Sequence, residues 1–155
     1  MSEIGDKIQA KCMAFADRVI KLNDYLLEQA ASKRYDGGSQ KADGKIQPSN
    51  FKHHTSRVPV YLQAVANICN QLLRAGTSIG ANNAEATNAV SRQDFRSKSY
   101  IALKEARESL YWIELLHRNA YLDDKQYESI YADCEELVKL LVTRCKKLDE
   151  DEKKN

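Results

Sequence analysis

Residues 71–86 read QLLRAGTSIGANNAEA, and this stretch decides between two kinds of fold. Gly76 and Gly80 lie four positions apart, which resembles a phosphate-binding loop at first sight. Such a loop requires a lysine directly after its second glycine and a buried strand before it. No lysine follows Gly80, and the apolar repeat of this region continues through both glycines in phase. We therefore predict that the stretch is helical and binds no nucleotide.

A glycine inside a helix costs about 1 kcal/mol of helix propensity relative to alanine, so some contact must offset it. Gly76 and Gly80 fall along one flank of the apolar seam, where small residues let a neighbouring backbone approach closely. The helix predicted over residues 92–119 carries small residues at Ala102 and Ala106. We predict close packing between these two pairs.

Apolar residues at alternating steps of three and four predict helices along most of the chain. Pro59 suits a first helical position, and Ser91 with Asp94 has the spacing of a capping box. The predicted helices span residues 3–32, 59–89, 92–119 and 124–149, with a flexible loop over 35–57 and a frayed tail over 150–155. Because the last three helices are joined by short links, we predict one all-α domain, an antiparallel up-and-down four-helix bundle.

Composition narrows the class of protein. Charged residues make up 30% of the chain but leave a net charge of only +2, so charge alone indicates neither a nucleic-acid nor a membrane partner. The four cysteines are far apart and lie on apolar seams, as reduced core thiols do. No segment has the apolar length of a signal peptide or a membrane span. We expect a cytoplasmic protein.

The sequence offers little that resembles a catalytic or metal site. A di-iron bundle needs two Glu-x-x-His motifs, and this chain has one, from Glu114 to His117. Glu105 and Glu108 lie beside basic residues on the same helix, where solvated ion pairs are the ordinary arrangement. We predict a protein that is not an enzyme and that has no cofactor and no metal.

Residues 92–119 are apolar on two sides. One side is the predicted core face: Phe95, Ala102, Ala106, Leu110 and Ile113. Ile101, Trp112 and Leu115 point nearly the opposite way. No helix of a four-helix bundle is central, so we interpret these three residues as an oligomer interface.

A stripe of basic and aromatic residues lies between those two faces. It consists of Tyr100, Lys104, Arg107, Tyr111 and Arg118. Cations interleaved with tyrosines can pair with phosphates and stack on bases. The same stripe can equally pair with acidic residues of a neighbouring subunit, and the sequence leaves both alternatives open.

The quoted stretch and residues 91–116, SRQDFRSKSYIALKEARESLYWIELL, closely resemble the four helix bundle protein family. These are the intervening-sequence proteins, from reading frames inserted in some bacterial large-subunit ribosomal RNA genes. The chain is also similar to the accessory variability determinant of diversity-generating retroelements. The resemblance implies an up-and-down bundle assembled as a homopentamer, without known catalysis. For the retroelement relatives it implies binding to RNA or DNA and to a reverse transcriptase. Asn83 departs from the family pattern, which usually has an apolar residue there.

Taken together, these features predict a non-enzymatic oligomeric scaffold or accessory protein that engages nucleic acid or a nucleic-acid enzyme. The alternative is a homo-oligomeric adaptor that binds only proteins.

Overall fold

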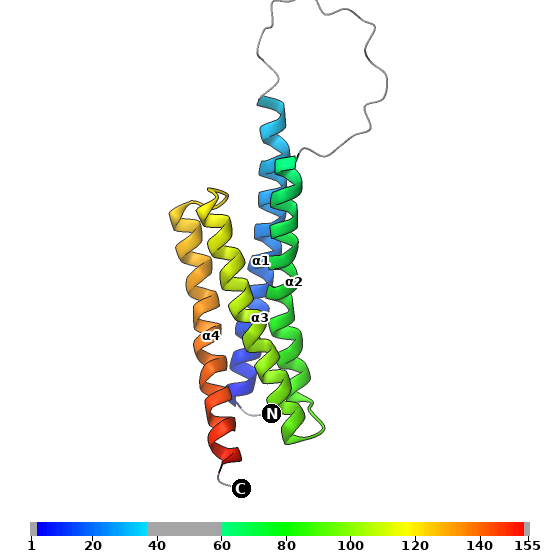
Figure 1. Ribbon diagram of the computed structural model, residues 1–155, viewed down its shortest axis with the longest axis vertical. Coiled ribbons are helices and arrows are strands. Elements are labelled where there is room, and N and C mark those ends of the chain that lie inside the picture. Colours follow the sequence, from blue (N-terminus) through cyan, green and yellow to red (C-terminus); the bar gives the residue numbers. More distant parts are fainter. Residues whose placement is uncertain (1–2, 37–59, 154–155) are drawn as a thin grey trace, which may run out of the picture.

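The computed structural model describes residues 3–36 and 60–153, which form four α-helices and no strand (Figure 1). The helices are α1 (Glu3–Asp36), α2 (Val60–Thr87), α3 (Arg92–Arg118) and α4 (Asp124–Glu152). The predicted all-α class is confirmed. The predicted loop over 35–57 lies outside the described residues, apart from its first two positions, which belong to α1.

Successive helices run antiparallel and pack side by side, and α1 closes the bundle by contacting α4 (Figure 1). Within the described part of the chain, no backbone Cα atoms of the diagonal pairs α1–α3 and α2–α4 come within 8 Å of each other, so these pairs meet only through side chains. This is the up-and-down bundle that the short links predicted. In Figure 1 the α1–α2 pair extends beyond the turn between α3 and α4, so the two helical hairpins differ in length.

Side-chain caps fix where α3 and α4 begin. Oγ of Ser91 accepts a hydrogen bond from the Asp94 N–H at 3.1 Å, as the spacing predicted. The Asp94 carboxylate accepts in turn from the Val90 N–H at 3.2 Å. α4 begins with a full capping box, in which Asp123 and Gln126 each accept from the other's backbone N–H.

The α3–α4 turn follows the backbone geometry of a Schellman motif. Ala120 has a φ of 57°, and its N–H donates to the carbonyl of His117 at 2.9 Å. The N–H of Tyr121 donates to the carbonyl of Leu116 at 3.0 Å. Alanine in this left-handed position carries strain that glycine would not.

α4 extends past the predicted end at residue 149, to Glu152. Ion pairs with the start of α3 hold this last turn: Arg92 lies 3.2 Å from Asp151, and Arg96 lies 3.4 Å from Glu152. α4 therefore includes residues 150–152 of the tail for which fraying is predicted, and the fraying itself stays a prediction.

The core forms along the bundle axis from all four helices. Its most enclosed large side chains are Ile8, Phe15, Val19, Val65, Ile79, Ile113, Leu116, Leu137 and Leu141. All four cysteines are free and buried, as predicted. Burial raises the pKa of the Cys12 and Cys69 thiols to about 11 and that of Cys134 to about 12. None of the described helices has an apolar run long enough to cross a membrane.

Gly76 and Gly80 lie inside α2, so the helical prediction is confirmed, but their predicted packing partner is wrong. A Cβ on Gly76 would meet Cγ2 of Val19 at 3.1 Å, and one on Gly80 would meet Cβ of Cys12 at 3.4 Å. Both neighbours belong to α1, not to the part of α3 that carries the alanines.

The reason for this error is that α2 carries small residues on both flanks of its seam, Ala75 and Ala86 being the others. Connectivity alone does not say which flank meets which neighbouring helix. Ala102 and Ala106 are fully buried in α3, and the carbonyl of Ala106 accepts from the Cys134 thiol of α4 at 3.3 Å.

Candidate nucleic-acid interface

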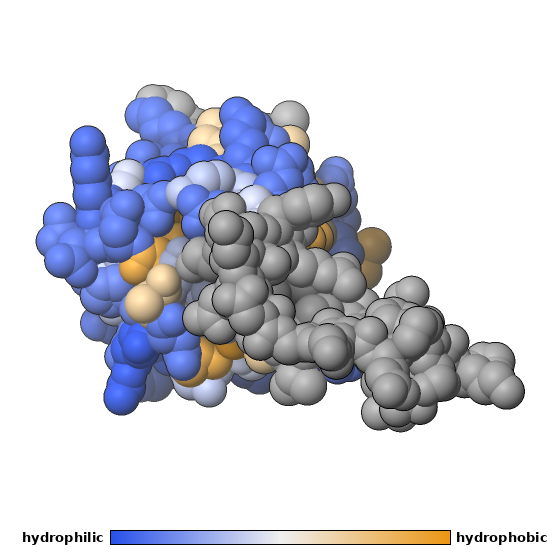
Figure 2. All heavy atoms as spheres, turned by 90° about the horizontal axis from the view of Figure 1, so that it is seen from above, coloured by the Kyte–Doolittle hydropathy of each residue, from blue (hydrophilic) through white to orange (hydrophobic). Residues whose placement is uncertain are grey.

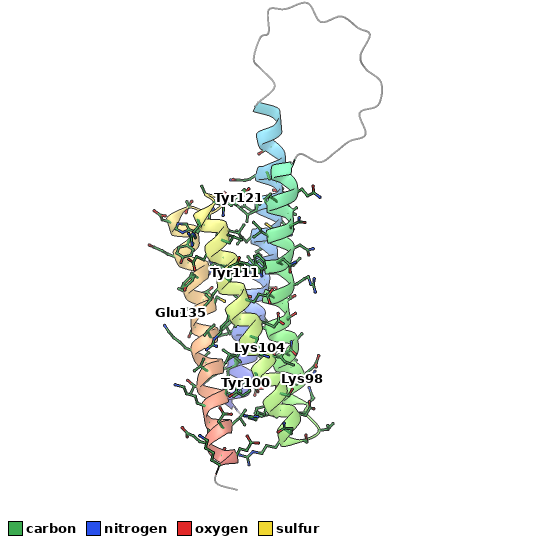
Figure 3. All side chains as sticks on the ribbon, in the orientation of Figure 1. Lys98, Tyr100, Lys104, Tyr111, Tyr121 and Glu135 are labelled. Atoms are coloured by element: carbon green, nitrogen blue, oxygen red, sulfur yellow. The ribbon has the colours of Figure 1, made fainter. Side chains whose placement is uncertain are left out.

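The outer face of α3 presents two cations and an aromatic ring. Lys104, Arg107 and Tyr111 are exposed, and Tyr111 keeps 57% of its surface open to solvent. Their spacing of three and four places them on one side of the helix. Figure 3 labels Lys104 and Tyr111 along α3, with Tyr100 one turn before Lys104.

Tyr100 is drawn into the contact between α3 and α4. Its hydroxyl donates to Oδ2 of Asp149 at 2.5 Å, and the Arg96 guanidinium lies 5.3 Å from the ring centre. Arg96 also donates to Oδ1 of Asp149 at 2.9 Å. Hydrogen bonds from Tyr100 and then from Arg96 lower the pKa of the Asp149 carboxyl. Tyr100 therefore joins two helices, and its hydroxyl is not available to an outside ligand.

Arg118 continues the stripe about two turns beyond Tyr111 along α3. It is exposed and lies 3.9 Å from Glu114, an (i, i+4) pair at the outer limit of ion pairing. Exposed pairs of this kind contribute little and dissociate readily. Arg118 can therefore leave Glu114 for a stronger anion such as a phosphate.

Lys104 and Arg107 lack the ion pairs that several other cations of the bundle form with carboxylates of a neighbouring helix. Five such cations are paired: Lys11 with Glu136, Arg18 with Asp133, Arg92 with Asp151, Arg96 with Asp149, and Lys98 with Glu85. Within residues 3–36 and 60–153, Lys104 and Arg107 form no ion pair. The nearby carboxylate of Glu108 accepts from the indole N–H of Trp112 at 3.0 Å. The outer face of α3 therefore holds two exposed cations without a direct ion-pair partner in the described residues, with the carboxylate of Glu108 on the same helix.

The predicted interface residues of α3 are less exposed than their pattern suggested. Ile101, Trp112 and Leu115 are each half-buried, and Trp112 packs against the hydrophobic core. The ring of Tyr111 meets that of Trp112 edge-on at 4.8 Å. The large apolar or aromatic side chains that stand out most among the described residues are Met13, Ile20, Tyr25, Val90 and Tyr111. The oligomer interface stays a prediction.

The single Glu-x-x-His motif has structural partners. The His117 ring stacks on Tyr127 at 4.1 Å, and its Nε2 lies 2.9 Å from the Asp124 carboxylate. In the described ranges no group of three or more His, Cys, Asp or Glu side chains is arranged to hold a metal ion. Burial and then the charge of Glu108 raise the pKa of Glu105, while Arg74 opposes the shift.

The sequence analysis missed a buried polar chain that crosses the bundle. Asn83 is fully buried in α2. Its amide donates to Oε1 of Gln9 in α1 at 2.5 Å, and its Oδ1 accepts from Nη1 of Arg144 in α4 at 2.6 Å. The signal was present: an asparagine at a seam position must find polar partners once it is buried. Only the fold, however, identifies them.

The surface seen from the α3–α4 turn is mostly hydrophilic in the part that Figure 2 shows, with small apolar areas between hydrophilic side chains. In the coloured part of this view no large apolar area is visible.

Comparisons with known proteins agree with the fold and show the family. A search of curated proteins found no match. The chain is similar to a crystal structure of a protein of unknown function from the S23 ribosomal protein family of Bacteroides thetaiotaomicron. The two are 35% identical with a TM-score of 0.68, over 92% of this chain and 98% of the other. Neither comparison bears on the resemblance to retroelement accessory proteins, which stays a prediction. The family described as 23S rRNA-intervening sequence protein matches residues 57–143, more than half of the chain, and the chain therefore belongs to that family.

Proposed function

We propose that this protein is a non-enzymatic accessory protein that binds the phosphate backbone of a nucleic acid through the outer face of α3. The observation that carries the proposal is the pair of exposed cations, Lys104 and Arg107, which form no ion pair in the described residues and lie beside the exposed ring of Tyr111. The family description, which refers to an intervening sequence of 23S rRNA, fits a nucleic-acid setting.

The physical basis is counterion release. Each phosphate that a lysine or arginine neutralises frees condensed counterions, and this gain supplies most of the non-specific affinity for nucleic acid. An exposed tyrosine adds a flat surface on which an unpaired base can stack, worth about 1–3 kcal/mol per base. Two or three phosphates fit Lys104, Arg107 and Arg118, so we expect weak binding that depends strongly on salt.

The test is a fluorescence anisotropy titration with labelled poly(U) of about 20 nucleotides and with a duplex of the same length, in about 50 mM salt. We expect the single strand to bind better because only it can stack on Tyr111. Replacing both Lys104 and Arg107 by glutamine should weaken binding at least tenfold. The matched control, Lys21→Gln with Lys125→Gln, removes the same charge from other exposed positions and should weaken binding far less. Equal losses in the two variants would contradict a site on α3.

We further propose that the bundle self-associates, with Ile101, Trp112 and Leu115 in the contact. Their partial exposure on one side of α3 supports this, because a second copy would cover what the single chain leaves open. The resemblance described above favours a homopentamer, and it favours a reverse transcriptase as a protein partner. The four buried thiols fit a reducing compartment, so we place the protein in the cytoplasm.

A purely protein-binding adaptor is the second candidate, and the same half-buried residues of α3 favour it. It differs from the first candidate in one measurable respect. An adaptor would self-associate but would show no affinity for either nucleic-acid probe in low salt.

A further inference from the structure

A cavity of about 510 Å³ opens at the end of the bundle where α1 begins and α4 ends. All four helices contribute to its lining, with Ile8 from α1, Thr87 from α2, Phe95 from α3, and Leu140, Arg144 and Leu148 from α4. Its size lies within the range of small-molecule sites, about 300–1,000 Å³. It lies apart from the exposed face of α3 that carries Lys104 and Arg107.

Arg144 is held in a fixed orientation at this cavity. Nη1 donates to Oδ1 of Asn83 at 2.6 Å, and the guanidinium carbon lies 5.6 Å from the centre of the Phe95 ring. Arginine only donates, so the oxygen of Asn83 must face Arg144, and its nitrogen must face Gln9. The buried amide therefore fixes both the position of the guanidinium and which of its edges stays open.

The open edge has no protein acceptor. Nε and Nη2 of Arg144 form no hydrogen bond within the described residues, and Arg144 forms no ion pair there. No fully buried side-chain nitrogen or oxygen in that part of the chain lacks a partner, so these two atoms keep some access to solvent, and Arg144 lines the cavity. Desolvation by burial lowers the pKa of Arg144, and no carboxylate opposes that shift.

A second hollow, of about 290 Å³, provides a contrast. It is lined by Arg92 and Arg96 among others, and both of these arginines pair with carboxylates of α4. Arg144 has no such carboxylate. A half-buried arginine without a counter-charge is costly to a fold, and an anionic ligand would compensate it.

The remaining lining limits the chemistry of that ligand. Ile8, Phe95, Leu140 and Leu148 supply an apolar wall. Lys147 adds one further cation, while Asp151, also in the lining, is already paired with Arg92. A highly charged ligand such as a nucleotide would meet both the apolar wall and a carboxylate. A single negative charge on an apolar body matches the lining best.

We propose that this cavity binds a small amphipathic carboxylate, whose two oxygens accept from Nε and Nη2 of Arg144 and whose apolar body lies against Ile8, Phe95 and Leu140. The planar Nε–Nη2 edge matches a carboxylate in a two-point arrangement. Asn83 serves as the positioning residue, since it touches the guanidinium and not the ligand.

The test is an NMR titration of the full-length ¹⁵N- and ¹³C-labelled protein with sodium octanoate. The Nε–H signal of Arg144 and the methyl signals of Ile8 and Leu140 should shift together and saturate. Two probes separate charge from apolar body: 1-octanol has the body alone, and inorganic phosphate has the charge alone. Each should bind at least tenfold more weakly than octanoate.

Variants at one position test the guanidinium edge. Arg144→Lys keeps the charge but loses the two-point arrangement, and we expect at least a fivefold loss of octanoate affinity with the fold retained by circular dichroism. Lys146→Met, an exposed position on the same helix outside the cavity, should bind octanoate as the unmodified protein does. Unchanged affinity in Arg144→Lys would overturn the proposal. So would octanol or phosphate binding as tightly as octanoate, or saturable shifts confined to residues outside this cavity.

Discussion

Nη1 of Arg144 lies 2.6 Å from Oδ1 of Asn83, and this hydrogen bond joins α4 to α2 inside the bundle. The amide of Asn83 also donates to Gln9, so one buried residue links three helices. A buried polar network of this kind depends on each buried atom having a partner, and no fully buried side-chain nitrogen or oxygen of the described residues lacks one.

Asn83→Leu should therefore destabilise the fold although it adds apolar volume. The leucine leaves Arg144 and Gln9 without their buried partner, at a cost of about 2 kcal/mol in the free energy of unfolding. The double variant Asn83→Leu with Arg144→Met removes the charge as well and should recover about half of that loss. Urea denaturation of the two single variants and the double variant provides the measurement.

Asn82→Leu is the matched control, because the Asn82 amide donates only to the carbonyl of Ser78 in its own helix, at 2.9 Å. Its effect should stay within about 0.5 kcal/mol. If both asparagine variants lose the same stability, the chain through Asn83 does not hold the helices together.

The two glycines of α2 should respond differently to alanine. A Cβ on Gly76 would stand 3.1 Å from Cγ2 of Val19, a buried β-branched side chain with little freedom to rotate. A Cβ on Gly80 would meet its nearest neighbour at 3.4 Å, an ordinary contact. Gly80→Ala should stabilise the protein by about 0.5–1 kcal/mol through helix propensity, whereas Gly76→Ala should destabilise it by about 1 kcal/mol. Thermal unfolding of the two variants provides the measurement. If Gly76→Ala proved more stable than Gly80→Ala, α1 would have to pack against α2 differently from the structure.

The contact between Tyr100 and Asp149 should be visible in a pH titration. Because the Tyr100 hydroxyl is the largest cause of the lowered pKa of Asp149, Tyr100→Phe should raise that pKa toward its usual value near 4. A carboxyl whose folded pKa is lowered stabilises the fold above its unfolded pKa and loses that contribution as the pH falls through the folded value. The ¹³Cγ shift of Asp149 gives the pKa directly, and an identical titration in Tyr100→Phe would rule out this bond in solution.

Self-association can be assigned to a face of the bundle with two matched charges. Leu115→Glu places a carboxylate on α3, and Ile20→Glu places one on α1, where Ile20 is 43% exposed. We expect light scattering to find an oligomer for the unmodified protein and for Ile20→Glu, and a smaller species for Leu115→Glu, with both variants folded by circular dichroism. If Ile20→Glu were the smaller species and Leu115→Glu the oligomer, the interface would lie on α1 and not on α3. A monomeric unmodified protein would refute self-association altogether.

The helices were predictable because their apolar periodicity and their caps are local properties. Ser91 and Asp94 were sufficient to locate the start of α3, and the seam through Gly76 was sufficient to reject a phosphate loop. The neighbours of a helix flank are not local. α2 has small residues on both flanks, so the sequence could not show whether Gly76 packs against α1 or α3. In the structure it packs against Val19 of α1.

The candidate sites were predictable only in part for the same reason. The spacing of Lys104, Arg107 and Tyr111 placed them on one exposed side of α3, but it could not show that Tyr100 is held by Asp149 across the helix contact. Arg144 gave no signal, because its importance depends on an asparagine 61 positions away.

The salt dependence of nucleic-acid binding tests the central claim most directly. Log Kd for poly(U) should rise linearly with log salt, with a slope of about 0.7 for each phosphate that is neutralised. Replacing Lys104 and Arg107 by glutamine should lower that slope by about 1.4, while the control with Lys21 and Lys125 replaced keeps the slope of the unmodified protein. A slope that is the same in all three proteins, or no binding at low salt, would contradict a phosphate-binding face on α3.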